Sequence, residues 1–278
     1  MKKSILCLAA LLALASAAVS CGQQEGPELK VMSFNIRMGV ADDGENAWEI
    51  RKPAVAEMLN TVNPVMFGVQ EAFDFQLEYI NENCPQYECV GVGREDGVDE
   101  GEHMSVFYNS EKIELLDWGT YWLSETPDVP SKGWDAACYR TATWTKVREK
   151  ASGKEFYFCN THLDHIGQAA RRNGLALIVE RIAEMNPEGL PMILTGDFNV
   201  TPDDPCLDDL ENMMLNSRYT AEDSDTATSY NGWGGASEEI DYIWYQGFDK
   251  CESFKVITEQ FAGKPYVSDH YPVVAVLK

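Results

Sequence analysis

Six apolar segments of seven to nine residues constrain the fold of this 278-residue chain more than any other feature. Most of them carry apolar side chains at successive positions, which is typical of β-strands that are covered on both faces of a sheet. We therefore expect strands at residues 29–36, 64–70, 155–163, 191–198, 239–245 and 271–278. Such strands need further layers to cover them.

Two segments between these strands have the periodicity of amphipathic helices. In residues 49–62 and 168–185, apolar side chains recur every three or four positions, and a proline, Pro64 or Pro187, follows each segment. This spacing places apolar side chains on one face of a helix, and a proline just beyond it favours the end of the helix. Helices mixed with strands in this order predict an α/β fold with two packed sheets and helices outside.

Residues 1–20 have the layout of a secretory signal, with Lys2 and Lys3, an apolar run and small residues before Cys21. Cleavage before Cys21 would expose a cysteine of the kind that carries the acyl anchor of bacterial lipoproteins. Ala18 stands where that pattern prefers leucine, so cleavage and release is the alternative. We expect a periplasmic, outer-membrane lipoprotein or secreted protein that meets membranes only through this anchor.

The rest of the chain reads as one unit. Residues 21–28 are a short tether, and residues 29–278 contain no repeat or low-complexity linker. About 250 residues suit a single domain with a substantial core. We expect this domain to be a monomer.

The chain is strongly acidic. Its formal charge is −23, with 22 basic and 45 acidic residues, and loss of Lys2 and Lys3 would make it −25. A nuclease that grips many phosphates needs lysine and arginine to displace counterions. Net charge does not exclude a local basic groove, but it disfavours long nucleic acid as the substrate.

The cysteines do not form a zinc-binding pattern. Six remain beyond residue 21, so disulfides are allowed in an oxidising compartment, but we predict no pairing. No CxxC occurs, and NTHLDH (residues 160–165) has Asn160 where the zinc-binding sequence HxHxDH has its first histidine. Zinc sites need more nitrogen or sulfur ligands than this cluster offers.

Residues 117–139, DWGTYWLSETPDVPSKGWDAACY, combine three tryptophans with prolines and glycines. We expect a long aromatic loop here, because long loops in compact domains are usually functional or packed on themselves. It is either an Ω-loop with a small aromatic core or a wall of the substrate site.

Nearly every expected strand ends in a polar residue that its apolar run does not explain. Together these are four carboxylates, two asparagines and two histidines: Asn35, Glu71, His162, Asp197, Asn199, Asp241, Asp269 and His270. Burial of so many charged groups without partners would cost several kcal/mol each. They therefore indicate one site, where they meet a cation or one another.

The ordered motifs FN (Asn35), QE (Glu71), THL (His162), GDFN, IDYI and SDH resemble those of the endonuclease/exonuclease/phosphatase superfamily. The resemblance runs from about residue 29 to 277 and is greatest to the nocturnin-like branch and to secreted bacterial relatives. It implies a four-layer α/β sandwich, with two mixed β-sheets packed face to face and helices outside. It also implies hydrolysis of phosphate esters with Mg²⁺ or Mn²⁺.

The resemblance also implies roles for these residues. Glu71 is the main metal ligand, helped by two others, Asn35 and Asp269. Hard oxygen donors of this kind suit Mg²⁺. The remaining residues are catalytic: Asp197 and Asn199 act on the attacking water and the phosphate, Asp241 orients His270 near the nucleophile, and His162 stabilises the developing charge or assists the leaving oxygen.

Five further residues are candidates for substrate binding. Arg140, beside Tyr139, is the natural extra cation for the phosphate, with a structural ion pair as the alternative. Asn160, Asp164 and His165 form a candidate branch-specific site, unless they belong to an exposed polar turn.

We therefore expect a divalent-metal-dependent phosphodiesterase or phosphatase that acts on an extracytoplasmic phosphate ester of unknown identity. A nuclease acting on RNA or DNA is the first alternative. A non-catalytic relative that binds a ligand is the second, although a binder has no need of all eight polar groups.

Overall fold

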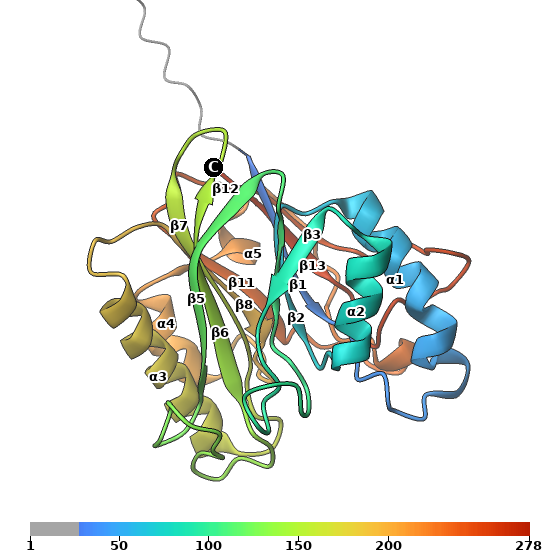
Figure 1. Cartoon of the computed structure of the whole chain (residues 1–278), viewed down its shortest axis with the longest axis horizontal. Helices are drawn as coiled ribbons and strands as arrows, with labels where there is room; N and C mark the ends of the chain where they lie inside the picture. Colours follow the sequence, from blue (N-terminus) through green and yellow to red (C-terminus); the bar gives the residue numbers. More distant parts are fainter. Residues whose placement is uncertain (1–27) are drawn as a thin grey trace, which may run out of the picture.

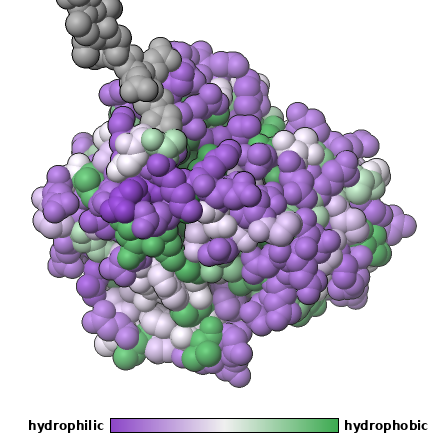
Figure 2. Space-filling model, turned by 45° about the horizontal axis from the view of Figure 1, so that its top comes forward, coloured by the Kyte–Doolittle hydropathy of each residue, from purple (hydrophilic) through white to green (hydrophobic). Residues whose placement is uncertain are grey.

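The computed structural model describes residues 28–278. The expected signal sequence, and all of the expected tether except Glu28, lie outside the described residues. Within residues 28–278, no helix is long and apolar enough to cross a membrane. The face shown in Figure 2 is mostly hydrophilic, as expected for a strongly acidic chain.

Two mixed β-sheets form the centre of the molecule (Figure 1). The first has seven strands, in the order β10 (Asp223–Ser224), β12 (Cys251–Val256), β13 (Val273–Leu277), β1 (Leu29–Asn35), β2 (Met66–Gln70), β4 (Val106–Asn109) and β3 (Tyr87–Val90). The second has six, in the order β5 (Ile113–Trp122), β6 (Thr141–Glu149), β7 (Glu155–His162), β8 (Met192–Asp197), β11 (Asp241–Gln246) and β9 (Leu215–Asn216).

Helices cover the outer faces of both sheets. The α1 helix (Trp48–Val62) and the α2 helix (Asp74–Asn83) lie on the first sheet, and the α3 helix (Gln168–Met185) and the short α4 helix (Asp208–Glu211) lie on the second (Figure 1). A further one-turn helix, α5 (Ser217–Thr220), precedes β10, and short 3₁₀ turns span Gly44–Asn46, Pro205–Leu207 and Gly232–Gly234.

Three apolar clusters hold these layers together. One lies between α1, α2 and the first sheet, one between the two sheets, and one between the second sheet and α3. Phe34, Phe158 and Trp244 are examples of their fully or almost fully buried side chains. Burial of such a side chain contributes about 1.5–3 kcal/mol. The predicted four-layer α/β sandwich is confirmed.

All six predicted strands and both predicted helices are present, with ends that differ by two residues at most. The prediction of a loop across residues 117–139 is partly wrong, because Asp117–Trp122 belongs to β5 and pairs with β6. This edge strand exposes part of its surface, so its sequence lacks a continuous apolar run. The irregular part, residues 123–139, does reach the cavity described below, through Cys138.

Strand register brings the polar strand ends together. In the parallel β7–β8 pair His162 lies opposite Asp197, and in the antiparallel β8–β11 pair Asp197 lies opposite Asp241. In the parallel β1–β2 pair Asn35 lies opposite Gln70, the residue before Glu71. Both sheets therefore present these side chains at the same edge.

Candidate active site

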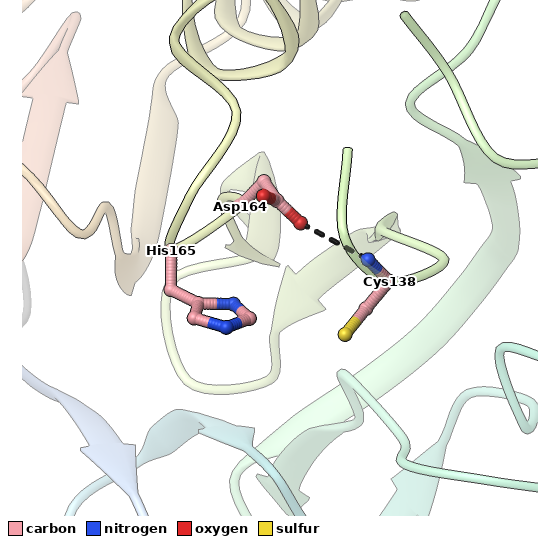
Figure 3. Close-up of side chains that lie close together, drawn as sticks. All are labelled: Cys138, Asp164 and His165. Atoms are coloured by element: carbon pink, nitrogen blue, oxygen red, sulfur yellow. Dashed lines mark hydrogen bonds between the residues drawn. The ribbon is translucent and has the colours of Figure 1, made fainter. Parts of the chain in front are cut away.

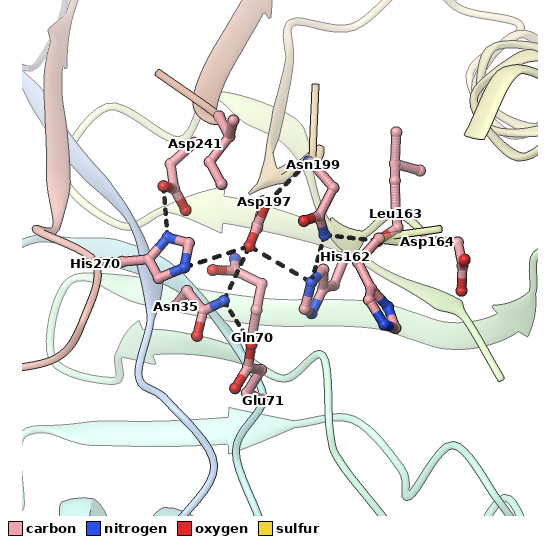
Figure 4. A network of polar contacts seen from close by, with 12 residues as sticks. Asn35, Gln70, Glu71, His162, Leu163, Asp164, Asp197, Asn199, Asp241 and His270 are labelled. Carbon is pink, nitrogen blue, oxygen red and sulfur yellow. Dashed lines mark hydrogen bonds and ion pairs between the residues drawn. The ribbon is translucent and has the colours of Figure 1, made fainter. Parts of the chain in front are cut away.

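Asn35 connects the two sheets at this edge (Figure 4). Its amide nitrogen donates hydrogen bonds to Glu71 Oε1 and to Asp197 Oδ2, both at 3.0 Å. Its carbonyl oxygen accepts a hydrogen bond from the backbone N–H of Arg37 at 3.0 Å. The side chain of Asn35 is fully buried. Asn35 thus fixes the distance between a carboxylate of the first sheet and one of the second.

Three residues around this bridge have left-handed backbone conformations. The φ angles are 60° at Arg37, 62° at Glu71 and 52° at Asn199. For a residue other than glycine this conformation costs roughly 1–3 kcal/mol, and such strain is typically concentrated at functional sites. Here the Oε2 atom of Glu71 accepts a hydrogen bond from the Met38 N–H at 3.1 Å, which holds the turn in place.

Two histidines approach the same carboxylate oxygen. The Oδ2 atom of Asp197 lies 3.4 Å from His162 Nε2 and 3.8 Å from His270 Nε2. On the other side of its ring, His270 Nδ1 lies 2.8 Å from Asp241 Oδ2. The backbone N–H of Asn199 donates to Asp197 Oδ1 at 2.9 Å. Asp197 therefore lies at the centre of the arrangement in Figure 4.

The two histidines differ in protonation. Burial opposes the charged form of His270, but the charges of Asp241 and Asp197 and the hydrogen bond that His270 donates to Asp241 raise its pKa to about 10. Burial, together with the charges of Arg140 and Arg94, holds the pKa of His162 well below its usual range. At neutral pH, His270 is a cation and His162 is neutral.

Burial and the nearby charge of Asp241 raise the pKa of Asp197 to about 7. A carboxylate with this pKa exchanges a proton readily near neutral pH, which is the property of an effective general base. Asn199 Nδ2 donates to the Leu163 carbonyl oxygen at 3.0 Å and lies 2.9 Å from His162 Nε2. Asn199 thus fixes the imidazole of His162 beside Asp197.

The donor set for a divalent cation is present at the edge of the first sheet. Glu71 and Asp269 both line the cavity, and Glu71 accepts a hydrogen bond from Asn35. Hard oxygen donors suit Mg²⁺ and Mn²⁺. Asp197, Asp241 and His270 each have one possible ligand atom within 4.8 Å of those of the other two. However, the His270 ring is already hydrogen-bonded to Asp241.

A fixed cation lies beside the oxygen donors. Arg37 Nη1 lies 4.0 Å from Glu71 Oε2, and its Nε lies 3.7 Å from Asp269 Oδ2. Asp43 holds the guanidinium by two hydrogen bonds, at 3.1 and 3.0 Å. Arg37 therefore offsets part of the negative charge that Glu71 and Asp269 bring to the site.

These groups surround a cavity of about 390 Å³, within the range of small-molecule sites. Its lining includes most of the predicted site residues: Glu71, Arg140, His162, His165, Asp197, Asn199, Asp269 and His270. Asn35 and Asp241 do not line the cavity and lie directly behind residues that do. Tyr139 is half-buried and is not part of the lining.

Asp164 holds Arg140 in place and does not line the cavity. Figure 3 shows its hydrogen bond from the Cys138 N–H. Its Oδ2 accepts hydrogen bonds from the N–H groups of Ala137 and Cys138 and from Arg140 Nε, at 3.1–3.2 Å. Its Oδ1 accepts from two further backbone N–H groups. Burial alone would raise the pKa of Asp164, but these contacts hold it well below its usual range.

Arg140 has two guanidinium nitrogens beyond the one bound to Asp164. Its Nη2 lies 2.9 Å from His165 Nδ1, and its Nη1 is buried without a partner in the described part of the chain. Cys138, Asp164 and His165 have the spacing of a metal-binding group. The guanidinium and the backbone N–H groups already occupy these acceptors, so an anion suits this part of the cavity better than a cation.

The expectation that Asn160 contacts substrate is wrong. Its side chain is fully buried between the sheets, where its oxygen accepts from Gln70 Nε2 at 2.6 Å and from Thr195 Oγ1 at 3.0 Å. Its nitrogen donates to the Val69 carbonyl oxygen at 2.8 Å. A Cβ at Gly68 would lie 2.2 Å from the Asn160 oxygen, so this packing depends on glycine there.

The sequence did not indicate the cavity residues Arg94, Glu102, Tyr230 and Glu238. Arg94 Nη1 donates to Glu102 Oε2 at 2.7 Å, and Arg94 Nε is buried and has no partner among residues 28–278. Both residues belong to the loop between β3 and β4. The available sequence signal for Arg94 was that it is the one arginine among several acidic residues in this loop.

A family model described as the Endonuclease/Exonuclease/phosphatase family matches residues 32–270, which include every strand-end residue of the site. The chain belongs to this family. Members of the family hydrolyse phosphoester bonds and generally use a divalent metal ion.

Solved structures and curated proteins agree with this assignment. A mannosyl-6-phosphatase of Bacteroides thetaiotaomicron VPI-5482 is 34% identical, with a TM-score of 0.85, over 90% of this chain and 99% of that one. An uncharacterized protein of Acanthamoeba polyphaga mimivirus is 27% identical over 90% of this chain and its own full length. The human nocturnin catalytic domain has the same fold, with a TM-score of 0.72 at 18% identity over 92% of this chain and 94% of that one.

Proposed function

We propose that this chain hydrolyses a small phosphate ester outside the cytoplasm, with Mg²⁺ or Mn²⁺ as cofactor. The observation that carries this proposal is the position of Asp197. Its carboxylate lies between a charged and a neutral histidine, and Asn35 connects it to Glu71 across the two sheets.

The chain's own groups can activate water and hold it. Asp197, with a pKa of about 7, accepts a proton from water, and the Asn199 N–H keeps its other oxygen in place. His270, charged and held by Asp241, places positive charge where the phosphate oxygens gather. Preorganised charge of this kind is usually the largest catalytic contribution.

Two buried arginines are suited to bind the phosphate. Arg140 Nη1 and Arg94 Nε have no partner within residues 28–278, and both side chains line the cavity beside His162. Arginine binds phosphate through planar, charge-assisted hydrogen bonds. Neutral His162 then stabilises the leaving oxygen by donating a hydrogen bond to it.

Glu71 and Asp269, with Asn35 behind them, would hold the divalent ion. When bound, the ion supplies positive charge to the phosphate and its leaving oxygen. Arg37, which is close to both carboxylates, limits the negative charge that the ion would meet.

The charge of the loop between β3 and β4 favours a small substrate over nucleic acid. The loop that provides Arg94 also carries four exposed carboxylates, on Glu95, Asp96, Asp99 and Glu100. Fixed negative charge repels a chain of phosphates. The 34%-identical Bacteroides neighbour, named a mannosyl-6-phosphatase, supports a sugar phosphate as the substrate class.

The test is release of inorganic phosphate from hexose phosphates, phosphodiesters and oligonucleotides, with Mg²⁺, Mn²⁺ or EDTA. We expect hydrolysis of hexose phosphates that EDTA abolishes. We also expect Glu71→Gln and His270→Ala to lower it at least about 100-fold. Cleavage of oligonucleotides alone would favour the nuclease alternative, and no hydrolysis of any substrate would favour the binding alternative.

Extracytoplasmic location and the lipid anchor belong to the same proposal, with Cys21 as the modified residue. Metabolic labelling with a fatty acid, followed by cell fractionation, tests them. We expect label in the wild type and none in Cys21→Ser. Unlabelled protein in the culture medium would instead support cleavage of the signal sequence and release of the protein.

A further inference from the structure

We propose that Tyr230 and Glu238 form a subsite for a neutral, polyhydroxylated ring attached to the phosphate, such as a hexose. This inference rests on the proposed phosphoesterase function and names the residues that select its substrate. Both side chains line the catalytic cavity, on the side of His270.

Tyr230 brings an aromatic surface next to the reacting groups. Its ring centroid lies 4.9 Å from that of His270, and within residues 28–278 its hydroxyl makes no hydrogen bond. The C–H groups of a sugar ring carry partial positive charge and pack favourably on the negative face of an aromatic ring. The phenol remains available to a substrate hydroxyl.

Glu238 provides a free acceptor at the same place. Tyr230 and Glu238 pair through their backbones, with N–H to carbonyl distances of 2.9 and 3.2 Å. The carboxylate of Glu238 is exposed and has no ion pair in the described part of the chain. An ionised carboxylate accepts several hydrogen bonds from neighbouring hydroxyl groups.

The loop between these two residues is fixed to the catalytic segment. The N–H groups of Asn231 and Gly232 donate to the Asp269 carbonyl oxygen at 2.8 and 3.0 Å, and Asn231 Nδ2 donates to that of Ser268 at 3.2 Å. Trp233 packs edge-on against Tyr266 at 6.2 Å. The subsite is therefore preorganised, which lowers the entropic cost of binding.

A close contact packs this loop tightly against Tyr266. Gly234 has a φ of 88°, and a Cβ at this position would lie 2.4 Å from the Tyr266 hydroxyl. Arg51 lies over Trp233, 5.7 Å from the ring centroid, and also donates to the Val267 carbonyl oxygen. The loop thus holds Tyr230 and Glu238 at a fixed position relative to Asp269.

The charge of Glu238 disfavours some substrates and favours others. Hydroxyl groups of the substrate donate hydrogen bonds to the carboxylate, whereas a second phosphate on the substrate meets an unpaired negative charge. Rejection by such an unfavourable contact is an efficient source of specificity. The subsite thus favours a monophosphorylated neutral sugar over a bisphosphate or a nucleotide.

The test compares Glu238→Gln and Tyr230→Leu with the wild type on mannose 6-phosphate, mannose 1,6-bisphosphate and ethyl phosphate, which has no ring. Glu259→Gln, at an exposed site without an ion pair, is the matched control. Hydrogen bonds to charged groups contribute about 1.5–3 kcal/mol. We therefore expect KM for mannose 6-phosphate to rise about 10-fold or more in either variant, with little change in kcat.

For ethyl phosphate, we expect the kcat/KM of Glu238→Gln to stay within about 2-fold of the wild-type value. For mannose 1,6-bisphosphate, we expect the kcat/KM of this variant to rise, because the negative charge that repels the second phosphate is gone. Equal losses on ethyl phosphate and mannose 6-phosphate, or no loss on either, would overturn the proposal. Calorimetric binding of mannose 6-phosphate to His162→Ala, with and without Glu238→Gln, tests the subsite even if turnover is absent. Equal affinity of these two proteins for mannose 6-phosphate would refute the subsite. Absence of turnover in the wild type, with this difference in affinity retained, would refute the proposed function and leave the subsite in place.

Discussion

Asp241 should determine the charge of His270, and replacing it with asparagine tests this directly. The hydrogen bond between them is 2.8 Å long, and the charge of Asp241 is the largest of the effects that raise the pKa of His270 to about 10. Burial acts in the opposite direction. In Asp241→Asn we therefore expect the pKa of His270 to fall to its ordinary value near 6.5 or below it.

The expected loss can be expressed as free energy. A fall of about 3.5 pKa units corresponds to about 5 kcal/mol of lost stabilisation of the imidazolium. Because the pKa of His270 is higher in the folded protein than in the unfolded chain, protonation of His270 stabilises the folded state. This stabilisation is fully present below about pH 6.5 and disappears as the pH rises towards 10. The wild type should therefore lose about 4 kcal/mol of this contribution between pH 7 and 10, whereas Asp241→Asn should not.

The assay is NMR titration of the His270 ring in EDTA-treated protein, together with urea unfolding at pH 7 and pH 10. Asp209→Asn, at an exposed position on α4, is the control and should match the wild type. A His270 pKa that stays near 10 in Asp241→Asn, or an unchanged pH dependence of unfolding, would refute this reasoning.

Three further predictions concern other parts of the site and core. Asp164→Asn removes the charge that holds Arg140, so we expect a loss of about 3–5 kcal/mol in urea unfolding and a higher KM for phosphate esters; an unchanged KM would contradict the role of Arg140. Gly68→Ala forces a Cβ against Asn160, so we expect a loss of about 1–3 kcal/mol with kcat of the folded enzyme retained, measured by thermal unfolding and kinetics. Glu71→Gln should weaken Mn²⁺ binding in calorimetry at least about 10-fold, and unchanged affinity would place the ion elsewhere.

The six strands that the sequence predicted are mostly buried on both faces, although the buried strand β4, with only four residues, was missed. Residues 192–197 of β8 and 273–277 of β13 are buried throughout, so their apolar runs are continuous. The edge strand β5 is exposed at several positions, and α2 has only ten residues, with three of them buried. Neither gives a clear periodic signal, and both were missed.

The strand-end motifs predicted most of the site, but not which residues face it. Asn160 and His162 lie on the same face of β7, because side chains two residues apart point to the same side. His162 is at the end of the strand and reaches the cavity, whereas Asn160, about 7 Å earlier, lies between the sheets. Arg94, Tyr230 and Glu238 come from loops, where no periodicity indicates their direction.

Phosphate release from mannose 6-phosphate by the wild type and by Asp197→Asn tests the central claim most directly. Asp197→Asn keeps the shape of the side chain and removes the base between His162 and His270. In the presence of Mg²⁺ we expect the wild type to release phosphate and the variant to be at least about 100-fold slower. Equal rates in the two proteins would contradict the account.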